Sequence, residues 1–187
     1  MTISRPASTD EGTDPATRRE AVATFTVHFT RFLDVSGAVT QLLPSPARTR
    51  GALVPLYRAM VLTRLLDAKA TSLQRTGRLG TYASSLGQEA VGVGTASAMT
   101  DTDVLLPSFR EQAALLWRGV SLREVLLYWG GDERGSDYGG PRHDFPICVP
   151  VASHTTHAAG VALAMRLRHE PRVAVCILGD GATSKGD

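Results

Sequence analysis

The chain has 187 residues, a formal net charge of +2 and two cysteines. A chain of this length can form one well-buried domain, which would hide roughly 70% of the surface of its unfolded form. Acidic and basic residues are interspersed, so no basic stripe indicates a nucleic acid or an anionic membrane as a partner.

The sequence predicts a protein that neither spans a membrane nor carries a signal peptide. No apolar run approaches the roughly 18 residues that a membrane-spanning helix needs, and the N-terminus lacks the apolar core of a signal sequence. Cys148 and Cys176 lie in apolar sequence, with no Cys or His at metal-binding spacing. We therefore expect buried, reduced thiols and a reducing, cytoplasmic compartment.

The N-terminal region divides into a tail and an arm. Residues 1–22 are rich in Ser, Thr, Pro and charge, which predicts a disordered tail, and their acidic residues argue against a mitochondrial transit peptide. In residues 23–50, Phe25, Val27 and Phe29 alternate with polar residues. This alternation predicts a half-exposed strand or an extended arm that lies on another surface, followed by a proline-marked linker.

A long helix is predicted over residues 53–76, with Gly77 as the residue that ends it. Its apolar residues recur at the spacing of one buried helix face: Leu62, Leu65, Leu66, Ala70 and Leu73. Residues 87–99 are dominated by Gly and Ala, which predicts a helix that packs closely on its neighbours or on another chain. We expect plain close packing within the chain.

The middle of the chain predicts a short strand at residues 104–106 and helices at about 110–117 and 122–129. Glycines and prolines crowd the stretch 130–150, and a long loop of this kind inside a domain is usually functional or disordered. Residues 157–167 are apolar nearly all round, which predicts a helix buried on several sides.

The last apolar run, residues 173–178, predicts a buried strand. Helices and strands thus alternate along the chain, an order typical of an α/β fold with a mostly parallel sheet flanked by helices.

The closing strand ends at Gly179-Asp180-Gly181. This position places Asp180 at the C-terminal edge of the sheet, where open α/β folds bind their ligands. Glycines let backbone N–H groups approach phosphate oxygens, and a carboxylate is a hard ligand for magnesium. A helix that began near Ser184 would add its first amides to the anion site. The triplet predicts a joint metal and diphosphate site, although alone such a triplet is a weak signal and more often marks only a tight turn.

Several further blocks lie in a characteristic order. They are Tyr57-Arg-Ala-Met60, Leu66-Asp67, Gln74-Arg-Thr-Gly-Arg78, Ser85-Leu-Gly-Gln-Glu-Ala90, Pro107-Ser-Phe-Arg-Glu111 and Gly179-Asp-Gly-Ala-Thr-Ser-Lys-Gly-Asp187. From about Thr24 onward the chain resembles the alpha subunit of the thiamine diphosphate-dependent decarboxylase component of the 2-oxo acid dehydrogenase complexes. The resemblance favours the pyruvate and branched-chain branches of that family over the acetoin branch.

The resemblance implies two cofactors, thiamine diphosphate and Mg²⁺, with Asp180 as a magnesium ligand. Gly181 and Ala182 would offer backbone contacts to the diphosphate. Arg110 matches an arginine that binds the same group, a role suited to a planar, permanently charged fork. Phe109 stands where the family usually has tyrosine, and losing that hydroxyl should cost roughly 1 kcal/mol of cofactor affinity.

The resemblance also implies that residues 146–160 line the aminopyrimidine ring, with backbone groups of Val149 and Val151 holding it. Some family members bind potassium at the positions that match Ser153 and His154, although the family usually has Gln in place of His154. We interpret His154 as a histidine at the start of a helix, without a functional role.

On this resemblance the fold is an incomplete thiamine diphosphate-binding fold with an extended N-terminal arm, in which residues 51–187 form the N-terminal part of the cofactor domain. The remaining metal ligands would come from further downstream and the catalytic glutamate from a beta subunit, so we assign no catalytic residue here. We therefore expect an N-terminal half of an alpha subunit that is inactive alone.

The implied activity is thiamine diphosphate-dependent oxidative decarboxylation of pyruvate or a branched-chain 2-oxo acid, with acyl transfer to lipoyl groups. The implied partners are a beta subunit, in a heterotetramer, and the lipoyl-bearing acyltransferase core. Two alternatives stay open: a non-catalytic partner that retains the subunit interface, and an acetoin dehydrogenase alpha subunit. A nucleotide-binding domain is disfavoured, because the chain has neither Gly-x-Gly-x-x-Gly after a strand nor Gly-Lys-Ser/Thr.

Overall fold

The computed structural model describes residues 23–186, so the tail predicted for residues 1–22 lies outside the described residues. The chain divides into two compact units, Met1–Arg48 and Thr49–Asp187. In the described part of the chain, no helix is both long and apolar enough to cross a membrane.

The first unit contains a tight turn and a short 3₁₀ helix, η1 (Ser45–Arg48). The turn is closed by an isolated antiparallel bridge between Leu33 and Val39, and the Asp34 carboxylate accepts hydrogen bonds from the backbone of Ser36 at 2.8 Å and of Ala38 at 2.9 Å. Of the two forms predicted for this segment, the half-exposed strand is wrong, because residues 23–31 pair with no strand among residues 23–186, whereas an extended arm on another surface stays a prediction. Phe25 and Val27 are 78% and 83% exposed.

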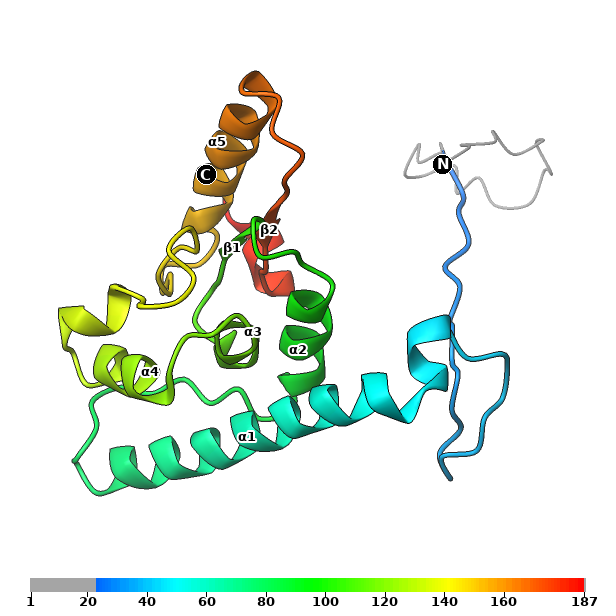
Figure 1. Ribbon diagram of the computed structural model, residues 1–187, viewed down its shortest axis with the longest axis horizontal. Helices are drawn as coiled ribbons and strands as arrows, with labels where there is room; N and C mark the ends of the chain where they lie inside the picture. The colour runs from blue at the N-terminus through cyan, green and yellow to red at the C-terminus, as the bar shows by residue number, and fades with distance from the viewer. Residues whose placement is uncertain (1–22, 187) are drawn as a thin grey trace, which may run out of the picture. The chain divides into compact units, whose positions relative to one another are not determined.

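The second unit combines helices with a small parallel sheet, which confirms the α/β class (Figure 1). Its helices are α1 (Arg50–Arg75), α2 (Glu89–Ser97), α3 (Gln112–Trp117), α4 (Leu122–Trp129) and α5 (Ser153–Leu167), with short 3₁₀ helices η2 (Glu133–Ser136) and η3 (Asp180–Ser184). Strands β1 (Val104–Leu106) and β2 (Ala174–Cys176) pair in parallel, with Leu105 opposite Val175. Helices α1, α2 and α3 contact one another, while α5 packs on both strands.

Helix α1 begins three residues before the predicted start and ends one residue before the predicted end. Gly77 has a φ of +70°, and the backbone N–H groups of Gly77 and Arg78 bond to the carbonyls of Gln74 and Leu73. This pair of bonds is the Schellman motif, which needs a left-handed residue that glycine adopts without strain. The expected role of Gly77 is confirmed.

The predicted buried face of α1 is partly wrong. Leu66 and Ala70 are buried, but Leu62 and Leu65 are 42% and 63% exposed. The buried stripe instead includes Asp67, whose carboxylate accepts hydrogen bonds from the Tyr82 hydroxyl, the Ser84 hydroxyl and the backbone of Ser85. These bonds compensate the burial of the charge and rotate the helix away from its most leucine-rich face.

Helix α2 packs closely on α3, as its small residues predicted. A Cβ atom at Gly92 would lie 2.7 Å from the Cβ of Ala113, whereas one at Gly94 would meet nothing within 4 Å. Close packing within the chain is thus confirmed at Gly92.

The main core lies between α3, α4 and the strands, around Leu105, Leu115 and Val125. A buried ion pair borders it: Arg118 Nε and Nη2 donate to the two Asp144 oxygens at 2.7 and 2.9 Å. The Arg118 side chain is 6% exposed and that of Asp144 is fully buried.

The long loop between α4 and α5 is fastened by specific bonds. The Glu124 side chain accepts from the backbone of Gly139 at 2.7 Å, and Asp144 accepts from the backbone of Leu105 at 2.8 Å. Phe145 and Cys148 then donate to the carbonyls of Leu105 and Pro107, so the loop runs beside β1 toward α5.

Helix α5 and strand β2 are less buried than predicted. Helix α5 starts at Ser153, and of its residues only His154 and Met165 are buried, because among the described elements it packs only on the sheet side. Leu163 is 57% exposed, and every residue of β2 is half-buried. Cys148 and Cys176 are unpaired as predicted but only half-buried, and burial raises the pKa of the Cys176 thiol.

Candidate functional site

A cavity of about 210 Å³ lies where the two parallel strands end. It is lined by segments that follow β1, precede α5 and follow β2: Gln88, Ser108, Phe109, Arg110, Glu111, Val151, Ala152, His154, Leu178, Gly179, Asp180, Gly181 and Ala182. Because parallel strands present their carboxyl ends at one edge, the segments after Leu106 and Cys176 meet there. The cavity is below the ~300 Å³ at which pockets for drug-sized molecules begin, so it suits a group of the size of a diphosphate.

Arg110 provides the cation of the cavity. Its Nε donates to the Ser84 carbonyl at 2.9 Å, and its guanidinium carbon lies 4.9 Å from the centre of the Phe109 ring. These contacts fix the plane of the guanidinium, and its terminal nitrogens have no hydrogen-bond partner among residues 23–186. A planar fork held in this way is suited to binding an anion with two oxygens.

Glu111 is a buried carboxylate in the same wall. It is 4% exposed, and its Oε2 accepts from the Ser108 hydroxyl at 2.7 Å and from the backbone of Arg110 at 3.2 Å. The bonds stiffen the turn between β1 and α3, which is the turn that carries Arg110.

Asp180 opens η3, four residues after the last residue of β2. Its side chain is exposed, and within the described chain its carboxylate forms no hydrogen bond or ion pair. The neighbouring Gly181 leaves the space where a Cβ would lie empty, while the backbone of Ala182 donates to the Gly179 carbonyl at 3.0 Å. The turn therefore presents a free carboxylate beside an unobstructed backbone, an arrangement suited to a metal bound with an anion.

The opposite wall is the start of α5. Val151 lines the cavity, whereas Val149 is 50% exposed and does not. Ala152 has a left-handed φ of +66°, unusual for a residue with a side chain. His154 is 3% exposed, and its Nε2 lies 2.8 Å from the Ile177 carbonyl oxygen.

The structure thus brings together every residue that the sequence singled out for cofactor binding, except Val149. The sequence motifs do not single out Glu111, and they indicate only a structural role at a helix start for His154. Glu111 stands next to Arg110 in its motif, which is a usable signal. Nothing local to the sequence indicates that His154 faces the end of β2, because that contact depends on tertiary packing.

No three His, Cys, Asp or Glu side chains in the described part of the chain are close enough to hold a metal together. A magnesium ion at Asp180 would therefore take most of its oxygen ligands from the bound anion and from water, as this ion commonly does.

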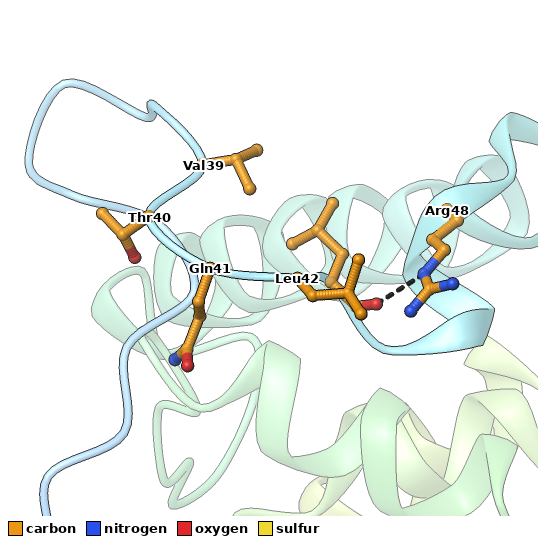
Figure 2. A pocket seen from close by; sticks show the side chains of 6 residues that line it. Val39, Thr40, Gln41, Leu42 and Arg48 are labelled. Atoms are coloured by element: carbon orange, nitrogen blue, oxygen red, sulfur yellow. Dashed lines mark hydrogen bonds between the residues drawn. The ribbon is translucent and has the colours of Figure 1, made fainter.

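A second hollow, of about 440 Å³, lies in the first unit (Figure 2). It is lined by Val39, Thr40, Gln41, Leu42, Leu43 and Arg48. Arg48 is the charged residue there, and its Nε already donates to the Leu43 carbonyl at 2.6 Å. The hollow contains no residue that the sequence motifs single out.

Comparisons with known proteins agree with the motifs. The family model described as "Dehydrogenase E1 component" matches residues 57–187. The chain is 42% identical over 132 residues to the 3-methyl-2-oxobutanoate dehydrogenase subunit alpha of Mycobacterium tuberculosis, an alignment that covers 71% of this chain and 36% of that protein.

Two pyruvate dehydrogenase E1 component alpha subunits are also similar. That of Acholeplasma laidlawii is 38% identical over 154 residues, covering 82% of this chain and 45% of the relative. That of Mycoplasma genitalium is 37% identical over 131 residues, covering 70% and 37%. The chain spans less than half the length of these relatives. The region matched by the family model, residues 57–187, contains every segment that lines the cavity. The chain belongs to the dehydrogenase E1 component family.

Proposed function

We propose that this chain supplies the diphosphate- and magnesium-binding part of the alpha subunit of a thiamine diphosphate-dependent 2-oxo acid dehydrogenase E1 component. The observation that carries the proposal is the cavity at the carboxyl ends of β1 and β2. Its lining includes the Arg110 guanidinium, the Asp180 carboxylate and the open Gly181 backbone. Cation, metal ligand and accessible amides are the groups that a magnesium diphosphate needs.

The residues present fit this cofactor. The Asp180 carboxylate would bind the magnesium ion, the Arg110 fork would bind a phosphate oxygen pair, and the Gly181 and Ala182 backbone would lie along the diphosphate. Backbone groups of Val149 and Val151 would hold the aminopyrimidine. When bound, thiamine diphosphate supplies the nucleophilic carbon and the electron sink for decarboxylating a 2-oxo acid.

The chain's own residues bind and orient, and we propose no proton transfer by any of them. A cavity of about 210 Å³ has room for the diphosphate end only, so apart from Val149 and Val151 we place the rest of the cofactor site outside the described residues. We infer that a beta subunit completes it, that acyl groups pass to a lipoyl-bearing acyltransferase core, and that this chain alone turns over no substrate.

The substrate and the compartment are further parts of this proposal. The relatives' names support pyruvate or a branched-chain 2-oxo acid as the substrate, and a panel of both acids and acetoin on the assembled enzyme decides between them. The unpaired thiols of Cys148 and Cys176 support the cytoplasm as the compartment.

Calorimetric titration with Mg²⁺ and thiamine diphosphate tests the proposal, on the chain alone and with an E1 beta subunit. We expect binding by the unmodified chain, none by Asp180→Ala and weakened binding by Arg110→Gln. Asp101→Ala and Arg166→Gln, which change exposed residues outside the cavity, should bind like the unmodified chain. Flat traces for all proteins, with and without the beta subunit, would instead support a non-catalytic partner.

A further inference from the structure

His154 joins the two walls of the cavity. It lies in the first turn of α5, next to the cavity residues Val151 and Ala152, and its Nε2 is 2.8 Å from the carbonyl oxygen of Ile177. Ile177 is the residue after β2 and leads directly into the turn that carries Asp180. The hydrogen bond therefore links the wall before α5 to the wall after β2.

The chemistry of this contact fixes the tautomer of the ring. A carbonyl oxygen only accepts hydrogen bonds, so the proton of a neutral imidazole lies on Nε2. Nδ1 is then a lone-pair acceptor, and it is buried with no hydrogen-bond partner among residues 23–186. Because this atom is closed off from the cavity as well as from solvent, the ring acts on the cavity walls through its Nε2 hydrogen bond.

The backbone beside His154 needs such a fastening. Ala152, at the start of α5, has a left-handed φ of +66°, a conformation that persists in a residue with a side chain only where surrounding contacts hold it. The ring of His154, at 3% exposure, is packed where it can provide that hold.

We propose that His154 is a positioning residue for the ligand cavity. Its Nε2–H holds the end of β2 against the start of α5, and so fixes the Asp180 turn opposite Val151. The proposal rests on the proposed function for the identity of the ligand, but not for the link between the walls.

Substitutions at position 154 test the link. His154→Leu removes both nitrogens, His154→Gln restores a donor and an acceptor, and His157→Gln makes a matched change at an exposed histidine one turn away. We expect His154→Leu to weaken binding of Mg²⁺ and thiamine diphosphate about tenfold, because the Asp180 turn is then no longer held in its binding position and one hydrogen bond is worth about that factor. His154→Gln and His157→Gln should stay within about twofold of the unmodified chain.

A ligand-free readout separates this inference from the proposed function. The backbone N–H of Ala182 donates to Gly179, so its hydrogen exchange reports how firmly the turn is held. We expect faster exchange in His154→Leu and unchanged exchange in the two glutamine variants. Circular dichroism checks folding, and if His154→Leu is unfolded, His154→Asn replaces it, because its amide is too short to reach the carbonyl.

The tautomer is read by ¹⁵N resonances of the His154 ring. We expect a proton on Nε2, both before and after Mg²⁺ and thiamine diphosphate saturate the chain. Equal affinity and equal Ala182 exchange in His154→Leu and the unmodified chain would overturn the proposal, as would a proton on Nδ1. An unmodified chain that binds no cofactor while His154→Leu accelerates exchange would instead refute only the proposed function.

Discussion

Replacing Asp144 by alanine should lower the free energy of unfolding of the second unit more than replacing any exposed charged residue does. Asp144 accepts from Arg118 Nε at 2.7 Å, from Arg118 Nη2 at 2.9 Å and from the backbone of Leu105 at 2.8 Å, and its side chain is fully buried. The substitution leaves a guanidinium that is 6% exposed without its counter-charge and the N–H of a β1 residue without an acceptor.

Breaking one side of a buried ion pair costs about 3–5 kcal/mol, because the remaining charge stays buried. For a chain of this size, each kcal/mol lowers the melting temperature by about 2–4 °C, so we expect a fall of roughly 6–20 °C. The Asp137–Arg142 pair is the matched control, since it has the same 2.7 Å separation but side chains that are 80% and 65% exposed. Asp137→Ala should cost less than about 1 kcal/mol.

Urea unfolding monitored by circular dichroism measures both variants. The double variant Arg118→Met/Asp144→Leu should be more stable than Asp144→Ala, because it removes both buried charges together. Two results would contradict this expectation. One is an equal loss of free energy of unfolding in Asp144→Ala and Asp137→Ala. The other is a loss in the double variant equal to the summed losses of its two single variants.

Further predictions concern packing, acid stability and cofactor affinity. Gly92→Ala should destabilise the chain by about 1–3 kcal/mol because its methyl group would collide with α3, whereas Gly94→Ala, with open space around it, should stabilise α2 by about 0.5–1 kcal/mol. The hydrogen bond from Arg64 holds the pKa of Glu89 at about 2, below its usual 4.5, so Glu89 contributes stability that is complete above about pH 5 and is lost as the pH falls toward 2. Phe109→Tyr should tighten binding of thiamine diphosphate about fivefold, the value of about 1 kcal/mol of hydrogen bonding.

Each of these predictions has a direct check. Chemical unfolding distinguishes the two glycine variants, and equal effects would contradict the close approach of α2 to α3. Stability measured from pH 7 to pH 2 should fall less steeply in Glu89→Gln than in the unmodified chain; parallel curves would exclude the Glu89 pair as a source of acid sensitivity. Calorimetry on Phe109→Tyr should show tighter binding, and an unchanged Kd would place that ring away from the phosphate.

Local signals predicted the element boundaries well. The limits of β1 and of α4, and the glycine end of α1 at Gly77, follow from features that act within a few residues of the chain: apolar runs, capping residues and left-handed glycines. These features do not depend on what the element packs against.

Burial was predicted less well, because it depends on distant residues. The leucines of α1 favoured one face, but the hydrogen bonds to Asp67 from the segment 82–85 selected another. Helix α5 is apolar nearly all round, yet periodicity gives no information on how many neighbours cover it, and Leu163 remains 57% exposed.

The candidate site shows the same division. Arg110 and Asp180 stand beside strand ends, so their meeting follows from parallel pairing and could be predicted. The hydrogen bond from His154 to Ile177 joins residues 23 apart in the sequence, and no sequence periodicity encodes it.

We propose that Asp180 binds the metal and Arg110 the phosphate of one metal diphosphate at the end of the sheet. A crystal structure with Mn²⁺ and thiamine diphosphate tests this arrangement, because the anomalous signal of manganese locates the ion. We predict one manganese ion bound to the Asp180 carboxylate and to the diphosphate, with a phosphate oxygen on the Arg110 guanidinium. Manganese at another carboxylate, or a diphosphate that contacts neither residue, would contradict the account.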